Sequence, residues 1–224
     1  MDEVGAAYAG CRARVAELAK GLDEARAQTL VPACPEWSVH DVVAHLAGVV
    51  DDALAGRLEG VATEPWTAAQ VQARRTRPIA DILAEWEETA PAFEELLDAI
   101  GAPGRQAVTD AVTHEQDIRG ALGVPGAKNA DAVRIGVGFL APALVDGAAR
   151  RGVSLHLRSH DGLEFGAKPA QVVLTGASFD LLRAMTGRRS ADQVREMLWD
   201  GDVEKVLPVF TFGPFRPATN RIEE

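Results

Sequence analysis

The sequence has little cysteine, few aromatic residues and no long apolar run. Only Cys11 and Cys34 occur in 224 residues, without a Cys-x-x-Cys pair, so neither a zinc knuckle nor a dithiol redox centre is indicated. Aromatic residues make up 5%, and the core must therefore be built mainly of alanine, valine and leucine. No uninterrupted apolar run reaches the roughly 18 residues that a membrane-spanning helix needs. We therefore expect no membrane partner.

An excess of basic residues is also absent. The net charge is −10, and without a basic stripe to neutralise phosphates we expect no nucleic-acid partner. The first 21 residues mix acids and arginines with apolar residues, unlike a secretion signal, so we expect a cytoplasmic location. In that reducing compartment a disulfide between Cys11 and Cys34 is not expected. We interpret Cys11 as a core residue and Cys34 as structural.

Helical periodicity runs through the first 150 residues, where apolar side chains recur at three- and four-residue spacing. It predicts helices over 2–28, from Ser38, from near Pro78, over 105–122 and over 130–151. Pro91 should kink or break the third of these. The segment LVPACPEW is predicted to be a connector, and Asp41, three residues after Ser38, supplies a variant capping box.

After Gly152 the pattern changes to short alternating segments. VSLHLRSHDGLEFG predicts a hairpin that turns at residues 159–162, and AQVVLTG predicts another strand. A short helix should end at Gly187, followed by a second short helix and an ambiguous strand in REMLWDGD. We therefore expect a helical domain over 1–150 and a small α+β domain over 151–224.

Two histidines, His40 and His45, lie on the predicted second helix. At 100° per residue, its valines and leucine form one apolar arc, and His40 falls ~120° from the centre of that arc. We therefore expect His40 to face solvent. His45 lies on the rim of the arc, ~40° from Val49. A histidine there can be either a hydrogen-bonded helper or a ligand.

A polar trio lies on the predicted fourth helix. Asp110, His114 and Asp117 are four and three residues apart and project from one face, among small apolar residues. Burying an unpaired carboxylate there would cost several kcal/mol. A divalent cation would offset this cost, since His and Asp at this spacing suit zinc. The alternative is that the trio pairs with arginine or lysine from elsewhere, and for Asp117 a structural role is favoured.

The segments CPEWSVHDVVAHL (34–46) and DAVTHEQD (110–117) together resemble the mycothiol-dependent maleylpyruvate isomerase family, a branch of the DinB-like bundles. In that family a Cys-Pro-x-Trp-Ser/Thr segment precedes a helix ending in His-Leu, and a later helix carries Glu-x-x-x-His-x-x-Asp. The stretch from 172 to 194 is similar to the family's small C-terminal domain. The resemblance covers nearly the whole chain. It implies a mostly α protein, a DinB-like four-helix bundle followed by a small α+β domain.

The resemblance also implies a metal site. It assigns the ligands of one divalent ion, zinc or nickel, to His45, Asp110 and His114, with mycothiol as the thiol cofactor or co-substrate. Asp110 departs from the family's glutamate, which puts metal geometry or affinity in doubt without removing the oxygen ligand. Three protein ligands leave coordination positions open, as in catalytic sites.

The implied activity is that of a cis–trans isomerase of maleylpyruvate type or a thiol S-transferase. In the isomerase, a metal-activated thiolate adds to the cis double bond, the adduct rotates, and elimination gives the trans product. The partners would be a small-molecule thiol and an electrophilic substrate. Arg188 and Arg189 follow a helix C-terminus, where cations are favoured in any case. The alternative interpretation is that they bind an anionic cofactor or substrate. The sequence singles out no catalytic acid or base. The alternative function is therefore a non-catalytic metal-binding or regulatory module on the same fold.

Overall fold

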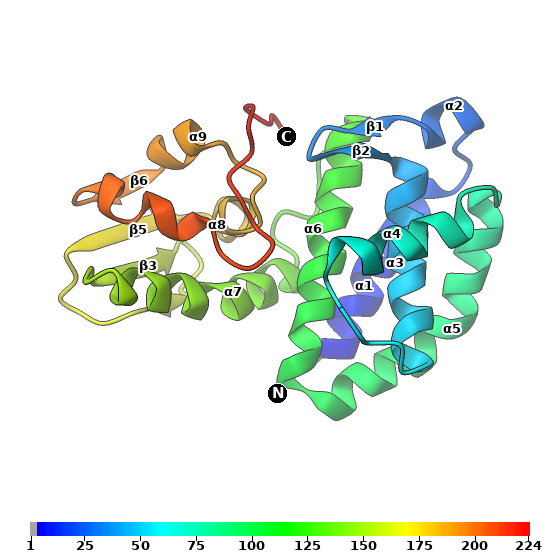
Figure 1. The fold of residues 1–224 in the computed structure, drawn as a ribbon, viewed down its shortest axis with the longest axis horizontal. Helices are drawn as coiled ribbons and strands as arrows, with labels where there is room; N and C mark the ends of the chain where they lie inside the picture. Colours follow the sequence, from blue (N-terminus) through cyan, green and yellow to red (C-terminus); the bar gives the residue numbers. More distant parts are fainter. Residues whose placement is uncertain (1–3) are drawn as a thin grey trace. The chain divides into compact units, whose positions relative to one another are not determined.

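The chain folds into two compact units in a computed structural model that describes residues 4–224 (Figure 1). The first unit runs to residue 126 and includes Glu224, and the second covers 127–223. The boundary therefore lies earlier than the expected one at residue 150. The physical reason is that helix α7 (Asp131–Arg150) packs on α8 (Ser178–Met185) and on strand β3 (Leu155–Ser159) of the second unit.

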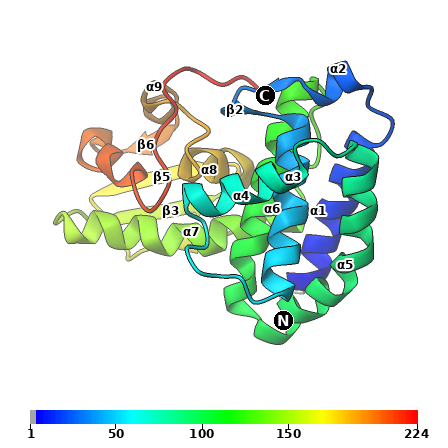
Figure 2. The same cartoon turned by 45° about the vertical axis from the view of Figure 1, so that its right-hand side comes forward.

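Four helices form the bundle of the first unit (Figures 1 and 2). They are α1 (Val4–Ala19), α3 (Val39–Leu54), α5 (Ile79–Ile100) and α6 (Arg105–Leu122). Helix α1 packs on α5 and α6, and α3 packs on the same two helices. Small residues dominate the interior, and the few aromatic ones gather at one point: Trp86 donates its indole N–H to the Tyr8 hydroxyl over 3.1 Å. Cys11 is fully buried, which confirms its place in the core.

The start of the chain differs from the predicted long helix. Helix α1 ends at Ala19, and a separate turn of helix, α2 (Glu24–Ala27), follows. Gly21 lies between them with φ +76°, a left-handed conformation that interrupts a right-handed helix and that glycine adopts readily. The side chain of Asp23 then accepts a hydrogen bond from the Arg26 N–H and begins α2.

The expected proline-rich connector is a small antiparallel ribbon of β1 (Leu30–Val31) and β2 (Cys34–Ser38). Ser38 ends the ribbon and begins α3. Its hydroxyl accepts from the Asp41 N–H, while the Asp41 carboxylate accepts from the Ser38 N–H, which confirms the capping box.

Two features of the α3–α5 region were not predicted. Helix α4 (Glu64–Arg74) packs on α3, although its sequence lacks a strong apolar stripe. Pro91 was expected to kink or break α5, and the helix continues through Pro91 without a break. A short 3-10 turn, η1 (Ala102–Gly104), then leads into α6.

The second unit is built around a mixed sheet with the order β4-β3-β5-β6. Its strands are β3, β4 (Glu164–Phe165), β5 (Val172–Gly176) and β6 (Leu198–Asp200). β3 and β5 run parallel, and the outer strands pair antiparallel. Helix α9 (Ala191–Arg195) and the 3-10 turns η2 (Val203–Lys205) and η3 (Leu207–Phe210) complete the unit. The mostly helical fold, a bundle followed by a small α+β region, is as predicted.

Among the described residues, one helix, α7, has the length and apolar composition that a membrane span requires. Core helices of globular domains meet the same two criteria. α7 contacts α8 and β3, with Leu140 and Leu144 among its buried residues. Packing inside the unit therefore accounts for part of its apolar composition.

Candidate metal centre

Two helices of the bundle bring together the three residues expected to bind a metal. His45 projects from α3, and Asp110 and His114 project from neighbouring turns of α6. The Nε2 atom of His45 lies 3.3 Å from Asp110 Oδ2, and the Nε2 atom of His114 lies 3.6 Å from Asp110 Oδ1. One ligand atom from each of the three residues lies within 4.8 Å of the other two. Both histidines are buried.

The tautomer of His45 follows from its hydrogen bonds. Its Nδ1 lies 2.8 Å from the side-chain oxygen of Gln70, and an amide oxygen only accepts. His45 therefore carries its proton on Nδ1. In the neutral ring Nε2, which faces Asp110, then carries a lone pair, the form in which histidine binds metals.

His114 has a different partner at its second nitrogen. Its Nδ1 lies 3.1 Å from Asp117 Oδ2, although it is buried and forms no hydrogen bond of normal geometry with the described residues. Cys34 Sγ lies 3.5 Å from the same carboxylate oxygen. A carboxylate behind a histidine is a common support of metal ligands. Cys34, His114 and Asp117 form a second group with metal-ligand spacing.

Trp37 lies against both histidines. It comes from β2, directly before the capped start of α3. Its ring centroid is 5.1 Å from that of His45 and 5.9 Å from that of His114. An indole here restricts both imidazoles to the observed orientations.

The donor set fits a divalent cation. Two imidazole nitrogens and one carboxylate converge, and these are ligand types that zinc and nickel accept. Asp110 is partly exposed, with 35% of its side chain accessible, so solvent or a small molecule can reach the centre. As ligands of one ion, these three residues would leave coordination positions open, as in catalytic sites.

The expected exposure of His40 is wrong. His40 is buried, and its Nε2 donates to the carbonyl oxygen of Arg77 over 2.8 Å. The helical angle correctly places His40 and His45 on different sides of α3. It could not show that the segment between α4 and α5, which contains Arg77, covers the His40 side of α3.

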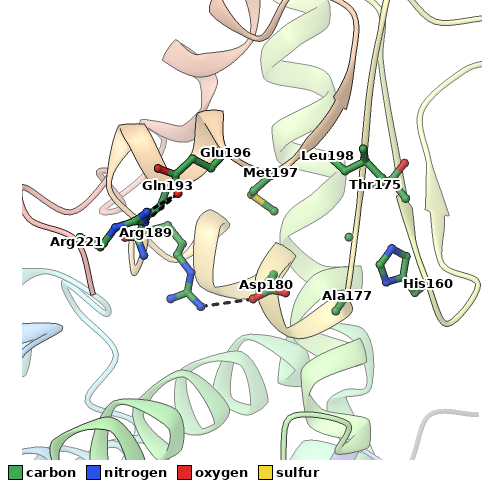
Figure 3. A pocket seen from close by; sticks show the side chains of 11 residues that line it. His160, Thr175, Ala177, Asp180, Arg189, Gln193, Glu196, Met197, Leu198 and Arg221 are labelled. Atoms are coloured by element: carbon green, nitrogen blue, oxygen red, sulfur yellow. Dashed lines mark hydrogen bonds and ion pairs between the residues drawn. The ribbon is translucent and has the colours of Figure 1, made fainter. Parts of the chain in front are cut away.

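Arg188 and Arg189 lie in the second unit, just after α8. Arg188 donates to the carbonyl oxygen of Thr186 over 2.7 Å. Arg189 lines a cavity of about 350 Å³, where Figure 3 shows its guanidinium directed toward Asp180, 3.5 Å away. Arg221, which lies near Arg189 in Figure 3 and also lines this cavity, pairs with Glu196.

Two residues of the centre were not singled out in the sequence. Trp37 belongs to the CPEW segment, and its place beside the histidines could have been suspected from that motif. Gln70 lies on α4, a helix without a strong apolar stripe, so no signal in the sequence pointed to it.

Comparison with known proteins agrees with this architecture. The profile of the mycothiol maleylpyruvate isomerase N-terminal domain matches residues 8–124. A crystal structure of a mycothiol-dependent maleylpyruvate isomerase with a histidine-to-alanine mutation is similar, with a TM-score of 0.57 and 14% identity over 84% of this chain and 89% of that one. A second crystal structure of a mycothiol-dependent maleylpyruvate isomerase gives a TM-score of 0.51 and 12% identity over the same shares. No curated protein sequence matches the chain. With more than half of its length matched by the family profile, the chain belongs to the mycothiol maleylpyruvate isomerase family.

Proposed function

We propose that the chain is a metal-dependent enzyme that uses a low-molecular-weight thiol, mycothiol, as cofactor or co-substrate. It acts as a cis–trans isomerase of maleylpyruvate type or as a thiol S-transferase. The observation that carries the proposal is the convergence of His45, Asp110 and His114 within 4.8 Å at a partly accessible point of the bundle. Family membership supports the choice of thiol. The proposed location is the cytoplasm.

In this proposal each residue has a defined task. His45 and His114 present Nε2, and Asp110 presents a carboxylate oxygen, to one zinc or nickel ion. Asp117 orients His114, and Trp37 holds both imidazole rings in place. A divalent ion of this kind stabilises a thiolate at neutral pH. Two neutral imidazoles and one carboxylate together carry a single negative charge, so the centre would be cationic with a divalent ion bound. A cationic centre favours an anionic thiolate.

Arg189 is proposed as a binding residue for an anionic group of cofactor or substrate, with Arg188 beside it. Support comes from the place of Arg189 on the wall of a cavity large enough for a small molecule. The Arg189 guanidinium lies 3.5 Å from Asp180 Oδ1 and donates to the carbonyl oxygen of Arg188 over 2.9 Å. A guanidinium group presents five N–H donors, the geometry that suits recognition of a carboxylate.

The test is the metal content of protein purified without chelators or a histidine tag. We expect about one zinc or nickel ion per chain in the wild type and none in His45→Ala or His114→Ala. His160→Ala, which removes an exposed histidine of the second unit, is the control and should keep the metal. No metal in the wild type, even after addition of zinc or nickel, would overturn the proposal.

Turnover separates the enzyme from a binding module on the same fold. We expect the metal-loaded protein to accelerate isomerisation of maleylpyruvate with mycothiol, or conjugation of mycothiol to an electrophile, and to lose this on chelation. The aspartate at position 110 in place of the family's glutamate, and the lack of an obvious general base, favour the module. Full metal occupancy without either activity would establish that second function.

A further inference from the structure

Gln70 is a buried polar residue on a largely exposed helix. Of the eleven residues of α4, only Gln70, Val71 and Arg74 are buried. A buried amide without hydrogen bonds costs about 1–3 kcal/mol, so its partners explain why it is tolerated there. Both ends of the amide group are hydrogen-bonded, one to His45 and the other to Asp52.

These bonds have a fixed direction. The Gln70 side-chain nitrogen donates to Asp52 Oδ2 over 2.7 Å, and an ionised carboxylate can only accept. The amide oxygen must then point the other way, to His45 Nδ1 at 2.8 Å. Asp52 is itself held by Arg57, whose Nε lies 2.7 Å from Oδ1. The hydrogen bonds thus have one arrangement: His45 donates to Gln70, and both Gln70 and Arg57 donate to Asp52.

A glycine makes the approach of Gln70 to α3 feasible. A Cβ atom added at Gly48 would lie 2.5 Å from the Cβ of Gln70 and 3.1 Å from Arg74 Nη1. The first distance is shorter than carbon atoms tolerate. Gly48 follows His45 by three residues, on the same side of α3. Because Gly48 has no side chain, α4 can lie close enough to α3 for the Gln70 amide to reach the His45 ring.

We propose that Gln70 is the positioning residue of His45: it holds the proton on Nδ1 and directs the Nε2 lone pair toward Asp110. Its effect on metal binding rests on the proposed function, in which His45 is a ligand. Asp52 accepts from the Gln70 nitrogen and so fixes the orientation of the amide group. Asp52 and Gln70 therefore act as one unit. The Nδ1 of His114 has a different neighbour, the carboxylate of Asp117 at 3.1 Å, without a hydrogen bond of normal geometry among the described residues. The two histidines of one centre therefore have a neutral and an anionic neighbour at Nδ1.

The first test replaces Gln70 with leucine, a side chain of similar volume without polar atoms. Gln72→Leu on the exposed side of α4 is the matched control. Two quantities are measured: the ring tautomer of His45 in the metal-free protein, from long-range ¹H–¹⁵N spectra assigned with His45→Ala, and the Kd for zinc by competition with a chromophoric chelator. We expect Gln70→Leu to lose the preference for the Nδ1-protonated form and to bind zinc about 10–100-fold more weakly. Gln72→Leu should match the wild type in both.

A second test exchanges the carboxylate and the amide group between positions 52 and 70. Gln70→Glu alone places two carboxylates together and should weaken zinc binding. In the double variant Asp52→Asn with Gln70→Glu, asparagine can donate to the new carboxylate, which still accepts from His45 Nδ1. We expect the double variant to keep the wild-type tautomer and to recover most of the zinc affinity. A purely structural contribution of Gln70 to packing predicts no such recovery.

The outcomes separate the inference from the proposed function. An unchanged His45 tautomer in Gln70→Leu overturns the inference, whether or not the wild type binds zinc. Wild-type zinc binding that is unaffected by Gln70→Leu also overturns it. A shifted tautomer in a protein that binds no zinc or nickel supports the positioning role and removes the proposed metal-dependent function instead.

Discussion

The two units of this chain contain polar clusters of opposite construction. In the second unit, the carboxylate of Asp161 is surrounded by donors: the hydroxyl of Ser159, the hydroxyl of Ser178 at 2.7 Å and Arg134 Nη1 at 2.7 Å. In the first unit, His45 Nε2 and Asp110 Oδ2, which are both acceptors when the ring is neutral, lie 3.3 Å apart. In the second unit hydroxyl and guanidinium donors surround one carboxylate, and in the first unit two imidazole nitrogens lie beside one carboxylate.

This difference shows how a structural cluster is told from a binding site. Burial alone would raise the pKa of Asp161, but the hydrogen bonds from Ser159 and Ser178 and the pairing with Arg134 lower it to about 2. The Asp161 carboxylate is therefore already paired with donors in and around the hairpin turn. Converging acceptors favour a cation, because each lone pair repels the next until a positive charge lies between them.

The largest expected effect comes from the core of the first unit. Trp86→Ala removes a fully buried indole and its hydrogen bond to Tyr8, and should lower the free energy of unfolding by about 3–5 kcal/mol. Leu30→Ala, at a residue 63% exposed, should change it by less than about 0.5 kcal/mol. Hydrogen exchange should show faster exchange in α1 and α5 than in β3 and β5. Equal acceleration in both units would mean that they unfold together, and the comparison of two independent units would fail.

Zinc should stabilise only the unit that has the converging acceptors. At a free zinc concentration 100 times the Kd, the free energy of unfolding should rise by about 2.7 kcal/mol. Slower hydrogen exchange is expected in α3 and α6, and neither effect should occur in His114→Ala. A similar slowing around Asp161, in β3 and α8, would show that the metal acts on both clusters.

Acid should affect the second unit through Asp161. Its pKa is lower in the folded protein than its ordinary value, so ionisation stabilises the fold at neutral pH. This contribution is complete above pH ~4, declines as the pH falls, and is absent once the pH passes below about 2. Asp161→Asn should therefore be less stable than wild type in urea at pH 6, with the gap closing toward pH 2. A gap of constant size would show that the charge of Asp161 is not what stabilises the turn.

The smallest effect concerns the two cysteines, which are both free thiols in the described chain. Burial raises the pKa of Cys11 to about 12, and nearby Glu115 adds to the rise. Cys34 is half-buried. Titration with a disulfide reagent should give one reactive thiol in the native protein and two in denaturant. Cys34→Ser should abolish the native reaction. Rapid labelling of Cys11 instead would mean that the α1–α6 packing opens readily.

Much of the first unit could be predicted from periodicity and caps. Helix α6, and helix α7 in the second unit, were expected close to their observed bounds, and α3 begins where it was expected, at the Ser38–Asp41 capping box. Helix α4 was missed because its buried face is only three residues wide, two of them polar. Its place depends on contacts with α3, which no local pattern encodes.

The exposure of His40 was wrong for a related reason. A helical wheel gives the direction of a side chain relative to its own helix. Whether that direction leads to solvent depends on the loop before α5, where Arg77 offers its carbonyl oxygen. The continuity of α5 through Pro91 has a similar cause. Helix α5 packs against α1 and α3, and these tertiary contacts outweigh one missing backbone hydrogen bond.

The sequence by itself determined the helical periods, the caps and the shared face of Asp110 and His114, because these depend on residues within a turn or two of each other. The tertiary structure alone decided that His45 faces this pair from another helix. It also decided that Gln70 sets the ring of His45 through a contact that Gly48 leaves room for. Helix packing and close backbone approach depend on surfaces that meet only after folding. A candidate ligand can therefore be named from its motif, whereas the residues that orient it are identified only from the tertiary structure.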